Sequence, residues 1–484
     1  MSVGDGDHPR EACGVFGIYA PGRSVAHATF DALHALQHRG QESAGMAVSD
    51  GQGIIVVKDM GLVATVFDDR TLAPLRGHLA IGHTRYSTTG SSDYNNAQPV
   101  YREPGESGFA LGHNGNLTNT AELATTAGML PGLVTSDSDL VGELIAAEFP
   151  PDELESSDGR DLERALTAVL PRLHGAFSFV VMDAAHLVGV RDPNGFRPLC
   201  LGKVDTGWVL ASESPALDVV GAHFVREVDP GEMVVIDAGG VRSERPFPPS
   251  RVNPTLCLFE LIYLARPDSR LYGREVHGAR RRMGQLLAEQ SPVEADMVMG
   301  VPESAVPAAE GYAKRSGIPY GQGLVKNRYM GRTFIDPNQE MRRRNVKRKY
   351  NPLKENVAGK RLVVVDDSIV RGTTQREIVA MLREAGAAEV HVRITSPPYK
   401  WPCFYGIDTG SRAELLAANM SVGEIVDYLG VDSLAFLNLD SVIQAVGAPG
   451  AGFCAACLTG EYPTEVPVTL GAKTPEGTPE RARG

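Results

Sequence analysis

This sequence of 484 residues has no long apolar run, no basic leader, no excess of positive charge and no internal repeat. The absence of a stretch of about 20 apolar residues excludes a membrane-spanning helix. The start MSVGDGDHPREACGVFGIYA lacks the basic residues and apolar core of a secretory signal, so a cytosolic location is expected. The net charge of −12 argues against a surface that attracts nucleic acid as a whole.

Cysteine is also scarce, with six in the chain. Disulfides are not expected in a reducing compartment, so clustered cysteines are more often metal ligands or nucleophiles. Hydrophobic residues make up 43% and charged residues 22%, as in soluble globular proteins. The length exceeds one ordinary hydrophobic core and therefore predicts two domains.

The segment PFPPSRVNP, residues 246–254, is the clearest linker. Before it, residues 13–245 contain short β-rich runs such as GVFGIYA and AFSFVVMD, separated by Gly-rich turns. Helical spacing of apolar residues occurs at 26–37 and 139–148. This mixture predicts a layered α+β domain.

Strands and helices alternate after the linker, over residues 255–468. RLVVVDDSIVRGTT begins with a β-rich run, and TTQREIVAMLREAGA is an amphipathic helix. Such alternation predicts an α/β domain with a mostly parallel sheet. Residues 469–484 are rich in Gly, Pro, Thr and charge and are expected to form a disordered tail.

Cys13 precedes a strand-like run, where a buried structural cysteine would be the ordinary interpretation. Four further segments change that interpretation: LQHRGQESAGM, GHTRYSTTG, HNGNLTN and TSDSD, at residues 36–46, 82–90, 113–119 and 135–139. In this order they resemble the motifs of the N-terminal-nucleophile glutamine amidotransferase domain. The resemblance implies a four-layer αββα glutaminase fold, in which Cys13 becomes the first residue after cleavage of a propeptide, residues 1–12.

A terminal position gives Cys13 a base of its own. A thiol has a reference pKa of about 8.5 and a free α-amine one of about 7.7–8.0. Near neutral pH the amine is therefore able to take the thiol proton and return one to departing ammonia. An amide nitrogen in an uncleaved chain lacks this basicity, so we expect the unprocessed chain to have no glutaminase activity.

The same resemblance implies roles for the other motifs. Asn114 and the backbone N–H of Gly115 correspond to the oxyanion hole, which stabilises the tetrahedral intermediate. Arg85 corresponds to the residue that pairs with the α-carboxylate of glutamine, and Asp137 to the carboxylate that holds its α-ammonium group. Arg39 corresponds to a residue beside the nucleophile and is counted with the glutamine-binding residues. A surface ion pair is the alternative for Arg39 and for Asp137.

The second half contains a strand, two aspartates and a Ser/Gly/Thr-rich turn in RLVVVDDSIVRGTT, residues 361–374. Ligands bind at this edge of an open α/β sheet, and N–H groups at a helix N-terminus suit a phosphate. The string resembles the phosphoribosyl pyrophosphate (PRPP) motif of type I phosphoribosyltransferases. The resemblance implies that Asp366 and Asp367 lie by the ribose. It also implies that the 5-phosphate is cradled by Ser368, Ile369, Val370, Arg371, Gly372, Thr373 and Thr374.

Two more segments complete the expected PRPP site. GVPESAVPAA, residues 300–309, resembles the pyrophosphate-side loop of this family, where Ser304 would join the two aspartates around one Mg²⁺. Residues 325–353 resemble the mobile loop that folds over PRPP. Their basic run MRRRNVKRK would by itself fit a solvated face equally well. In this context Lys326, Arg332 and Lys349 are expected to stabilise the leaving pyrophosphate.

The order of the two halves points to one family. The glutamine half alone occurs in glucosamine-phosphate synthase and asparagine synthetase, and the phosphoribosyl half alone in nucleobase salvage enzymes. Fused in this order, and with LIYLARPDS at 261–269, they resemble the amidophosphoribosyltransferase family. The resemblance implies formation of 5-phosphoribosylamine, glutamate and pyrophosphate from glutamine, PRPP and water, the first committed step of purine synthesis. It also implies a homotetramer that AMP, ADP and GMP inhibit.

Four cysteines add a further expectation. Cys454 and Cys457 form a C-x-x-C, Cys257 lies in NPTLCLFE and Cys403 in YKWPCFYG. Spacing alone is compatible with zinc, an iron–sulfur cluster or scattered structural cysteines. The contexts resemble the subclass of the family that holds a structural [4Fe–4S] cluster and carries a propeptide. Cys200 is left over and is expected to pack in a core.

Two other functions stay open at this point. A glutamine-dependent transferase with another acceptor would share the first half, but the PRPP motif at 366–374 argues against it. A regulator that senses PRPP without catalysis would share the second half. The net charge of −12 and the intact Cys13, Asn114 and Gly115 argue against that function.

Overall fold

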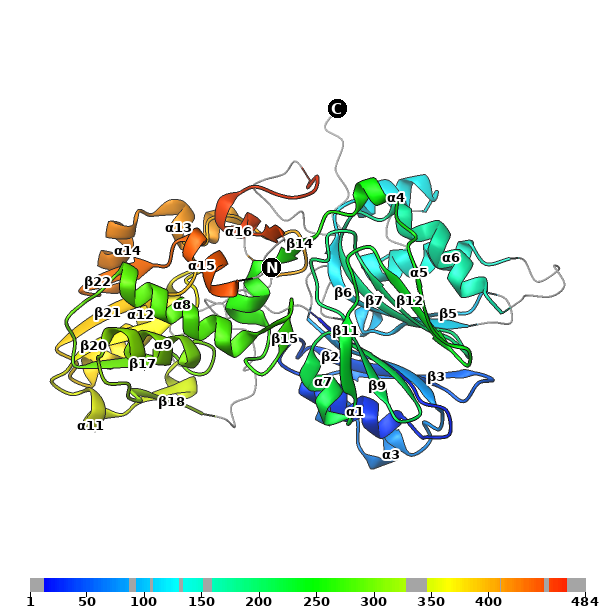
Figure 1. Cartoon of the computed structure of the whole chain (residues 1–484), viewed down its shortest axis with the longest axis horizontal. Helices are drawn as coiled ribbons and strands as arrows, with labels where there is room; N and C mark the ends of the chain where they lie inside the picture. Colours follow the sequence, from blue (N-terminus) through cyan, green and yellow to red (C-terminus); the bar gives the residue numbers. More distant parts are fainter. Residues whose placement is uncertain are drawn as a thin grey trace.

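A computed structural model of the chain describes residues 13–86, 93–104, 108–129, 134–150, 159–327, 346–409, 411–447 and 452–467. Figure 1 shows two halves side by side, the N-terminal half on the right and the C-terminal half on the left. The predicted propeptide, Arg332 and the predicted tail lie outside the described residues. No helix among the described residues is long and apolar enough to cross a bilayer.

Two antiparallel sheets form the centre of the first half, with strand orders β11-β9-β10-β1-β4-β2-β3 and β13-β12-β8-β7-β6-β5. The strands of the first sheet are β1 Gly14–Tyr19, β2 Ser43–Ser49, β3 Ile54–Met60, β4 Leu79–Arg85, β9 Cys200–Val204, β10 Gly207–Ala211 and β11 His223–Glu227. Those of the second are β5 Val100–Arg102, β6 Phe109–Leu117, β7 Gly175–Met182, β8 Leu187–Arg191, β12 Met233–Asp237 and β13 Gly240–Glu244.

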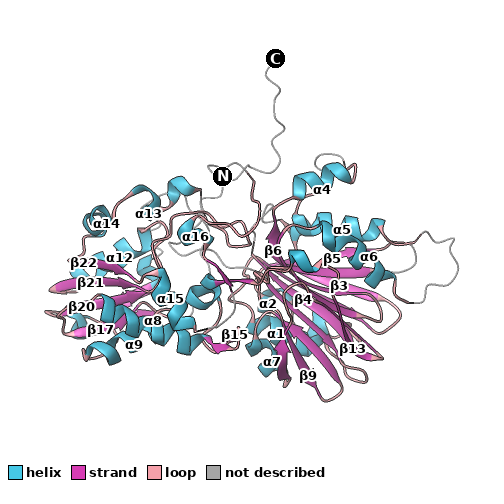
Figure 2. Cartoon of the chain, turned by 45° about the horizontal axis from the view of Figure 1, so that its top comes forward, coloured by secondary structure: helices cyan, strands magenta, loops and turns pink. Residues whose placement is uncertain are grey.

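Helices cover the outer face of each sheet (Figure 2). On the first sheet lie α1 Ala26–Ala35, α2 Val63–Val66, α3 Asp69–Leu72 and α7 Ser214–Val219. Near the second lie α4 Thr120–Thr126, α5 Asp137–Ala147, α6 Asp161–Val169 and the 3-10 turns η1 Tyr94–Asn96 and η2 Leu170–Arg172. A separate core between the sheets includes Val15, Ile81 and Val180. The predicted four-layer αββα fold is thus confirmed.

The second half contains a parallel sheet of order β17-β20-β21-β22: Met297–Gly300, Arg361–Asp366, Glu389–Ile394 and Ser433–Phe436. Alternate residues of β20 face opposite sides. Val363 and Val365 pack with α8 Val276–Gln290 and α9 Val306–Ser316, and Leu362 and Val364 pack with α12 Thr373–Glu384 and α14 Val422–Leu429. The predicted α/β sheet with crossover helices is confirmed.

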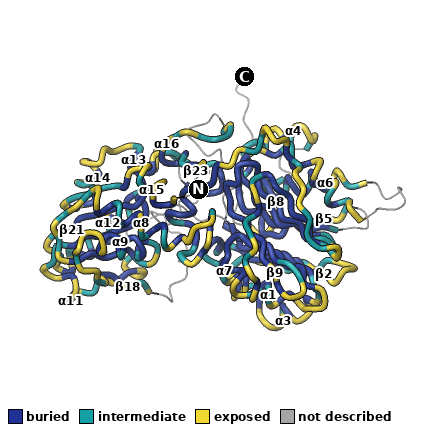
Figure 3. The backbone as a smooth tube through the Cα atoms, in the orientation of Figure 1, coloured by how far each residue is buried: buried dark blue, intermediate teal, exposed yellow. Residues whose placement is uncertain are grey.

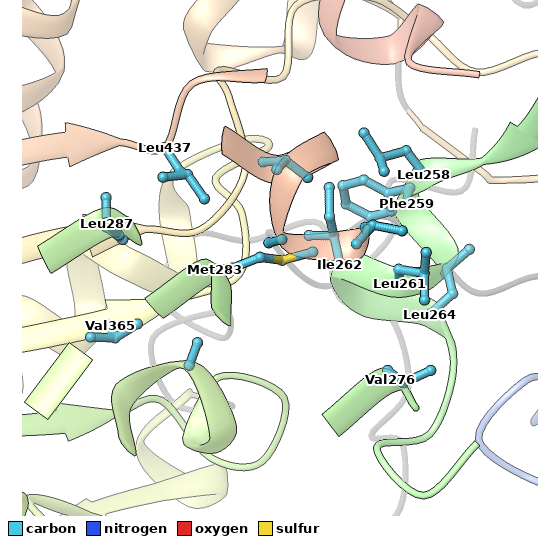
Figure 4. Packing of buried hydrophobic residues seen from close by; sticks show 14 of the residues in the cluster. Leu258, Phe259, Leu261, Ile262, Leu264, Val276, Met283, Leu287, Val365 and Leu437 are labelled. Atoms are coloured by element: carbon cyan, nitrogen blue, oxygen red, sulfur yellow. The ribbon is translucent and has the colours of Figure 1, made fainter. Parts of the chain in front are cut away.

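Short elements join these layers. They are η3 Pro249–Arg251, β14 Thr255–Cys257, the π-helix η4 Glu260–Leu264, β15 Arg270–Leu271, β16 Arg274–Glu275, β18 Leu324–Lys326, β19 Tyr350–Pro352, α11 Lys354–Val357, η5 Arg412–Glu414, α13 Leu416–Asn419, α15 Leu439–Val446, β23 Gly452–Cys454 and α16 Ala456–Thr459. Figure 4 shows Leu258, Phe259, Leu261, Ile262 and Leu264 in one buried cluster with Met283, Leu287 and Leu437. Figure 3 shows that buried residues, in dark blue, occur in the interior of both halves.

Candidate functional site

Cys13 lies directly before β1, the strand that pairs with β4 near the middle of the first sheet. Its side chain is 5% exposed, and its Sγ contacts the main chain of Tyr86, 3.4 Å from the oxygen and 3.5 Å from the nitrogen. Burial raises the pKa of the Cys13 thiol to about 11, although the Tyr86 main chain and Arg85 act in the opposite direction. The sulfur is therefore a protonated thiol at neutral pH and needs a base to become a nucleophile.

The side chain of Asn114, on β6, is fully buried. Neither its Nδ2 nor its Oδ1 has a hydrogen-bond partner among the described residues. An unsatisfied buried amide is unfavourable by about 1–3 kcal/mol, so native proteins keep few of them. Gly115 follows at φ +153°, and a methyl group on it would lie 2.0 Å from the Ala176 oxygen. Only glycine fits there, and both predicted oxyanion-hole residues occupy unusual positions.

Arg85 and Asp137 both interact electrostatically with the Cys13 thiol. Asp137 is the first residue of α5 and accepts hydrogen bonds from the N–H groups of Leu117, at 3.1 Å, and Ser138, at 2.8 Å. Burial opposes ionisation of Asp137, but His113 and these hydrogen bonds hold its pKa below the usual value. A buried cation and a buried anion thus flank the thiol, as a zwitterionic amino acid requires.

Arg39 makes buried contacts that the sequence did not predict. Its guanidinium is 1% exposed, and its Nε donates to Glu213. Nη2 and Nη1 donate to the two carboxylate oxygens of Glu260, at 2.6 and 3.3 Å. The Arg39 guanidinium therefore forms ion pairs with two carboxylates, and these pairs are buried and not on the surface. The adjacent Gly40 packs on β4 so closely that a methyl group would lie 2.5 Å from the Thr84 oxygen.

The ion pairs of Arg39 belong to a buried network that sequence analysis missed. Glu260 also accepts from Arg197 Nη1 at 3.0 Å. Glu213 accepts from the Arg266 N–H at 2.9 Å and from Ser269 Oγ. We call Arg39, Arg197, Glu213 and Glu260 the buried charge network. One feature of the sequence indicated this network, the glutamate within the apolar run LCLFELIYL. An unpaired charge is rarely fully buried, so a glutamate in a buried run implies a cationic partner.

The predicted PRPP residues gather at the carboxyl ends of two adjacent strands, β17 and β20. Ser304 Oγ donates to Asp367 Oδ2 at 2.5 Å, and Ser368 Oγ to Asp367 Oδ1 at 2.7 Å. Asp366 accepts from Gln375 Nε2 at 2.8 Å. The three residues predicted to hold Mg²⁺ thus lie together. Two carboxylates and a hydroxyl suit this ion, which usually completes its coordination with substrate phosphates.

The turn after β20 presents mainly backbone. Ile369 and Val370 are buried in the core, and Arg371 Nη2 donates to Glu414 at 2.7 Å. Gly372, at φ +78°, caps α12, and Thr373 and Thr374 form the first turn of that helix. A methyl group on Gly372 would lie 2.5 Å from the Leu416 side chain. The turn therefore needs glycine for packing as well as for its backbone conformation.

Lys326 and Lys349 stand at the base of the basic loop. β18 and β19 pair antiparallel, with Lys326 opposite Tyr350, and the Asn327 N–H donates to the Lys349 oxygen at 2.9 Å. Lys326 Nζ lies 3.5 Å from Glu303 Oε2, next to Ser304. Lys326 is therefore held beside the pyrophosphate-side loop, and Lys349 lies across the β18–β19 pair from it.

Four buried or half-buried cysteines come together between the halves. Cys257 and Cys454 are register partners of β14 and β23, and Cys457 follows in α16. The Cys457 thiol interacts electrostatically with all three others, Cys403 included, and burial raises its pKa well above the usual value. No three His, Cys, Asp or Glu side chains in the described ranges are arranged to hold a single metal ion. A cluster offers a separate iron to each thiolate, so its four ligands need not converge on one point.

A buried cation, Arg197, lies beside these cysteines and bears on whether they could hold a negatively charged metal cluster. It is fully buried and interacts electrostatically with Cys257 and Cys403. Within the described part of the chain its Nε and Nη2 have no hydrogen-bond partner. A buried guanidinium that lies beside the Cys257 and Cys403 sulfurs, with two nitrogens unpaired among the described residues, suits thiolates that hold a metal cluster better than neutral thiols. Cys200, by contrast, packs in the core under the first sheet, as expected.

Comparisons with known proteins agree with both halves. The glutamine amidotransferase domain matches residues 83–219, and the phosphoribosyl transferase domain matches residues 274–395. The amidophosphoribosyltransferase of Mycobacterium leprae is 54% identical over 96% of this chain and 84% of its own length. That of Bacillus subtilis is 45% identical over 94% of this chain and 95% of its own length.

Solved structures extend this agreement to the fold. Glutamine PRPP amidotransferase from B. subtilis, complexed with ADP and GMP, matches with a TM-score of 0.85 and 44% identity, over 94% of this chain and 98% of that one. A structure described as the allosteric regulatory enzyme of purine biosynthesis matches with a TM-score of 0.86 and 43% identity, over 95% and 99%. This chain therefore belongs to the amidophosphoribosyltransferase family, the enzymes of the first step of purine biosynthesis.

Proposed function

We propose that this chain releases ammonia from glutamine at Cys13 and transfers it to PRPP at the end of β20. The products are 5-phosphoribosylamine, glutamate and pyrophosphate. The observation that supports this most directly is the buried amide of Asn114, which has no hydrogen-bond partner in the part of the chain that the structure describes. It lies on β6, the strand that Asp137 contacts at Leu117, and Asp137 also interacts with the Cys13 thiol.

Glutamine hydrolysis would proceed with Arg85 on the α-carboxylate and Asp137 on the α-ammonium group. The Cys13 α-amine, freed by removal of residues 1–12, takes the thiol proton as Sγ bonds to the amide carbon. The carbonyl π electrons move to oxygen, where Asn114 and the Gly115 N–H stabilise them. Collapse breaks the C–N bond, ammonia leaves with the proton held by the α-amine, and water hydrolyses the thioester to glutamate.

The second step places ammonia on the ribose. Asp366 and Asp367 would bind the ribose hydroxyls, while the turn at 368–374 binds the 5-phosphate. Ser304, Asp366 and Asp367 would hold Mg²⁺, which supplies positive charge next to the leaving pyrophosphate when bound. The ammonia lone pair attacks C1, the bond from C1 to the pyrophosphate oxygen breaks, and a proton is lost. Lys326, Arg332 and Lys349 would stabilise the departing anion, and loop closure would keep ammonia from becoming ammonium in water.

Four finer features complete the proposal. We propose domains at 13–245 and 255–468. We also propose a structural [4Fe–4S] cluster on Cys257, Cys403, Cys454 and Cys457, supported by the buried Arg197, whose Nε and Nη2 have no partner within the described ranges. Inhibition by AMP, ADP and GMP is supported by the B. subtilis structure, which is complexed with ADP and GMP. A homotetramer is carried over from the family resemblance, and a cytosolic location is proposed with it.

The proposal is tested by Cys13→Ala, assayed for pyrophosphate release with glutamine and with concentrated ammonium chloride. Glutamine-dependent activity should fall by more than about 10³-fold because the nucleophile is gone, and ammonia-dependent activity should persist. Cys200→Ala, which changes another buried cysteine, is the matched control and should keep both activities. A Cys13→Ala enzyme that still hydrolyses glutamine, or that is inactive with ammonia, would contradict the two-site mechanism.

The propeptide and the cluster have a test of their own. Intact mass under native, anaerobic conditions should show a mature chain that begins at Cys13 and carries four iron and four sulfur atoms per subunit. A chain that begins upstream of Cys13 while hydrolysing glutamine at full rate would refute the role of the α-amine. A sample without iron would refute the cluster.

A further inference from the structure

The loop at residues 403–406 of the second half lies against the strand that contains the proposed oxyanion hole. Asn116 Nδ2, one residue beyond Gly115, donates to the Phe404 oxygen at 3.0 Å. A methyl group on Gly406 would lie 3.0 Å from both Cα and the carbonyl carbon of Gly115, and 3.2 Å from its oxygen. The backbone of one half therefore packs directly on the Gly115 peptide of the other.

The same loop is held from behind by a ring stack. Tyr405 stacks on Phe196 with ring centroids 4.1 Å apart and planes 12° apart, and both side chains are buried. The Tyr405 N–H donates to Cys403 Sγ at 3.3 Å, and its hydroxyl lies 2.9 Å from Thr464 Oγ1. With these contacts on both sides, the loop has little freedom to move relative to β6.

Gly115 is thus confined from two directions. On one side is the Ala176 oxygen on β7, which would lie 2.0 Å from a methyl group on Gly115. On the other side is Gly406, itself at φ +97°. Ala176 also packs in one cluster with Phe196 and Tyr405. The peptide at φ +153° is held between a strand of its own half and a loop of the other half.

We propose that Gly406 is a positioning residue for glutamine hydrolysis, because its backbone fixes the Gly115 peptide where the oxyanion develops. This inference rests on the proposed oxyanion role of Gly115 and extends it. An oxyanion donor stabilises the transition state only when it is held within a few tenths of an ångström of its working position. Glutamine hydrolysis therefore depends on a loop of the phosphoribosyl half that acts through the Gly115 peptide. Because Cys403 begins this loop, whatever holds its sulfur also restrains Gly115.

The test is Gly406→Ala in the full-length enzyme. The added methyl group should displace the Gly115 peptide, so kcat for glutamine hydrolysis should fall by about 10- to 100-fold, with the KM for glutamine within about threefold. Ammonia-dependent pyrophosphate release should stay within about twofold, since the PRPP site is untouched. Alkylation of Cys13 by iodoacetamide, which needs no oxyanion hole, should keep its rate.

Gly430→Ala is the matched control. Gly430 has φ +69°, so alanine there meets a similar backbone strain, but a methyl group on Gly430 meets no atom within 4 Å. It should change neither activity. Tyr405→Leu is a second variant, which loosens the loop without adding atoms near Gly115. It should lower the glutamine kcat less than Gly406→Ala, with the same selectivity.

The outcomes separate this inference from the proposed function. If Gly406→Ala leaves the glutamine kcat unchanged while Cys13→Ala abolishes hydrolysis, the positioning role is wrong and the two-site mechanism stands. If Gly406→Ala lowers both activities equally, or changes only the KM for glutamine, the loop does not act through Gly115. If Gly406→Ala does not fold and Tyr405→Leu lowers both activities, the inference is also overturned. If Cys13→Ala hydrolyses glutamine normally, the proposed function itself fails.

Discussion

The two candidate sites differ in one polar group that is left unpaired at only one of them among the described residues. At the PRPP site the carboxylates are already hydrogen-bonded, Asp366 to Gln375 and Asp367 to Ser304 and Ser368. At the glutamine site Asn114 is fully buried, and its amide is unpaired among the described residues. At the PRPP site, transition-state stabilisation would come from cations that bind next to the carboxylates. At the glutamine site, the oxyanion donors are already in place before the substrate binds. The glutamine site should therefore respond to small displacements, and the PRPP site to loss of charge.

The largest effect is expected from Asp367→Asn, which removes one negative charge at the PRPP site. Loss of a metal ligand and of a contact with the ribose should raise the activation free energy by several kcal/mol. Activity should therefore fall by about 10³-fold or more, whether glutamine or ammonia is the nitrogen donor. Pyrophosphate release with each nitrogen donor measures this. Asp432→Asn, in a partly exposed pair with Arg383, is the control and should be nearly neutral. If Asp367→Asn lowered activity with glutamine but not with ammonia, the assignment of Asp367 to the PRPP site would be wrong.

Glu260→Gln should have the next largest effect, on stability. It removes the carboxylate that pairs with Arg197 and leaves Arg39 paired with Glu213 alone, so a buried charge is uncompensated and the free energy of unfolding should fall by about 3–5 kcal/mol. Glu414→Gln, whose carboxylate pairs with Arg371 while 47% exposed, should change it by less than about 1 kcal/mol. Denaturant unfolding followed by fluorescence compares the two variants. Equal losses would show that the buried charge network is no more important than a surface pair.

Asn114→Ala sharpens the comparison at the glutamine site. Removing one oxyanion donor should lower kcat for glutamine hydrolysis by about 10²–10³-fold, equivalent to about 2.7–4 kcal/mol. Ammonia-dependent activity should not change. Asn356→Ala, on the surface of the second half, is the matched control. Normal glutamine turnover by Asn114→Ala would remove the main support for the oxyanion hole.

The smallest effect concerns pH and His83, whose Nε2 lies 2.9 Å from the His113 oxygen beside the glutamine site. Burial lowers the pKa of His83 to about 3, so it stays neutral in the folded protein. Between about pH 3 and 6.5 the unfolded chain binds the extra proton, and stability rises with pH by up to about 1.4 kcal/mol per unit from this group. His83→Gln should remove this contribution to the rise of the free energy of unfolding with pH. Denaturant midpoints from pH 4.5 to 7.5 measure it. An unchanged slope would show that His83 titrates normally in the fold.

Periodicity and motif order were sufficient to predict much of this molecule. The continuous apolar run Leu-Val-Val-Val in RLVVVDD indicates a buried strand, and two aspartates at its end indicate the edge where a ligand binds. The helices expected at 26–37 and 139–148 occur at Ala26–Ala35 and Asp137–Ala147. These features are local, so short stretches of sequence contain the information.

What the sequence did not predict depends on contacts between distant residues. Arg39 and Glu260 are 221 positions apart, and no periodicity relates them. The same holds for Asn116 and the Phe404 oxygen, which are 288 positions apart. Arg39 was counted with the glutamine-binding residues because its motif resembles the family segment beside the nucleophile, and its carboxylate partners become apparent only in three dimensions. The roles of the site residues therefore remain predictions for the variants above to test.

The buried charge network also limits how the two halves can be recombined. The linker at 246–254 looks like the natural junction for a chimera, yet the partners of Glu213 and Arg39 extend to Glu260, Arg266 and Ser269. With a junction in the linker, Arg39 and Glu213 would come from one parent protein. Their partners beyond the linker would come from the other parent. Moving the crossover beyond residue 269 keeps all these partners on one parental segment. The module that can be exchanged is thus longer than the domain that the fold suggests.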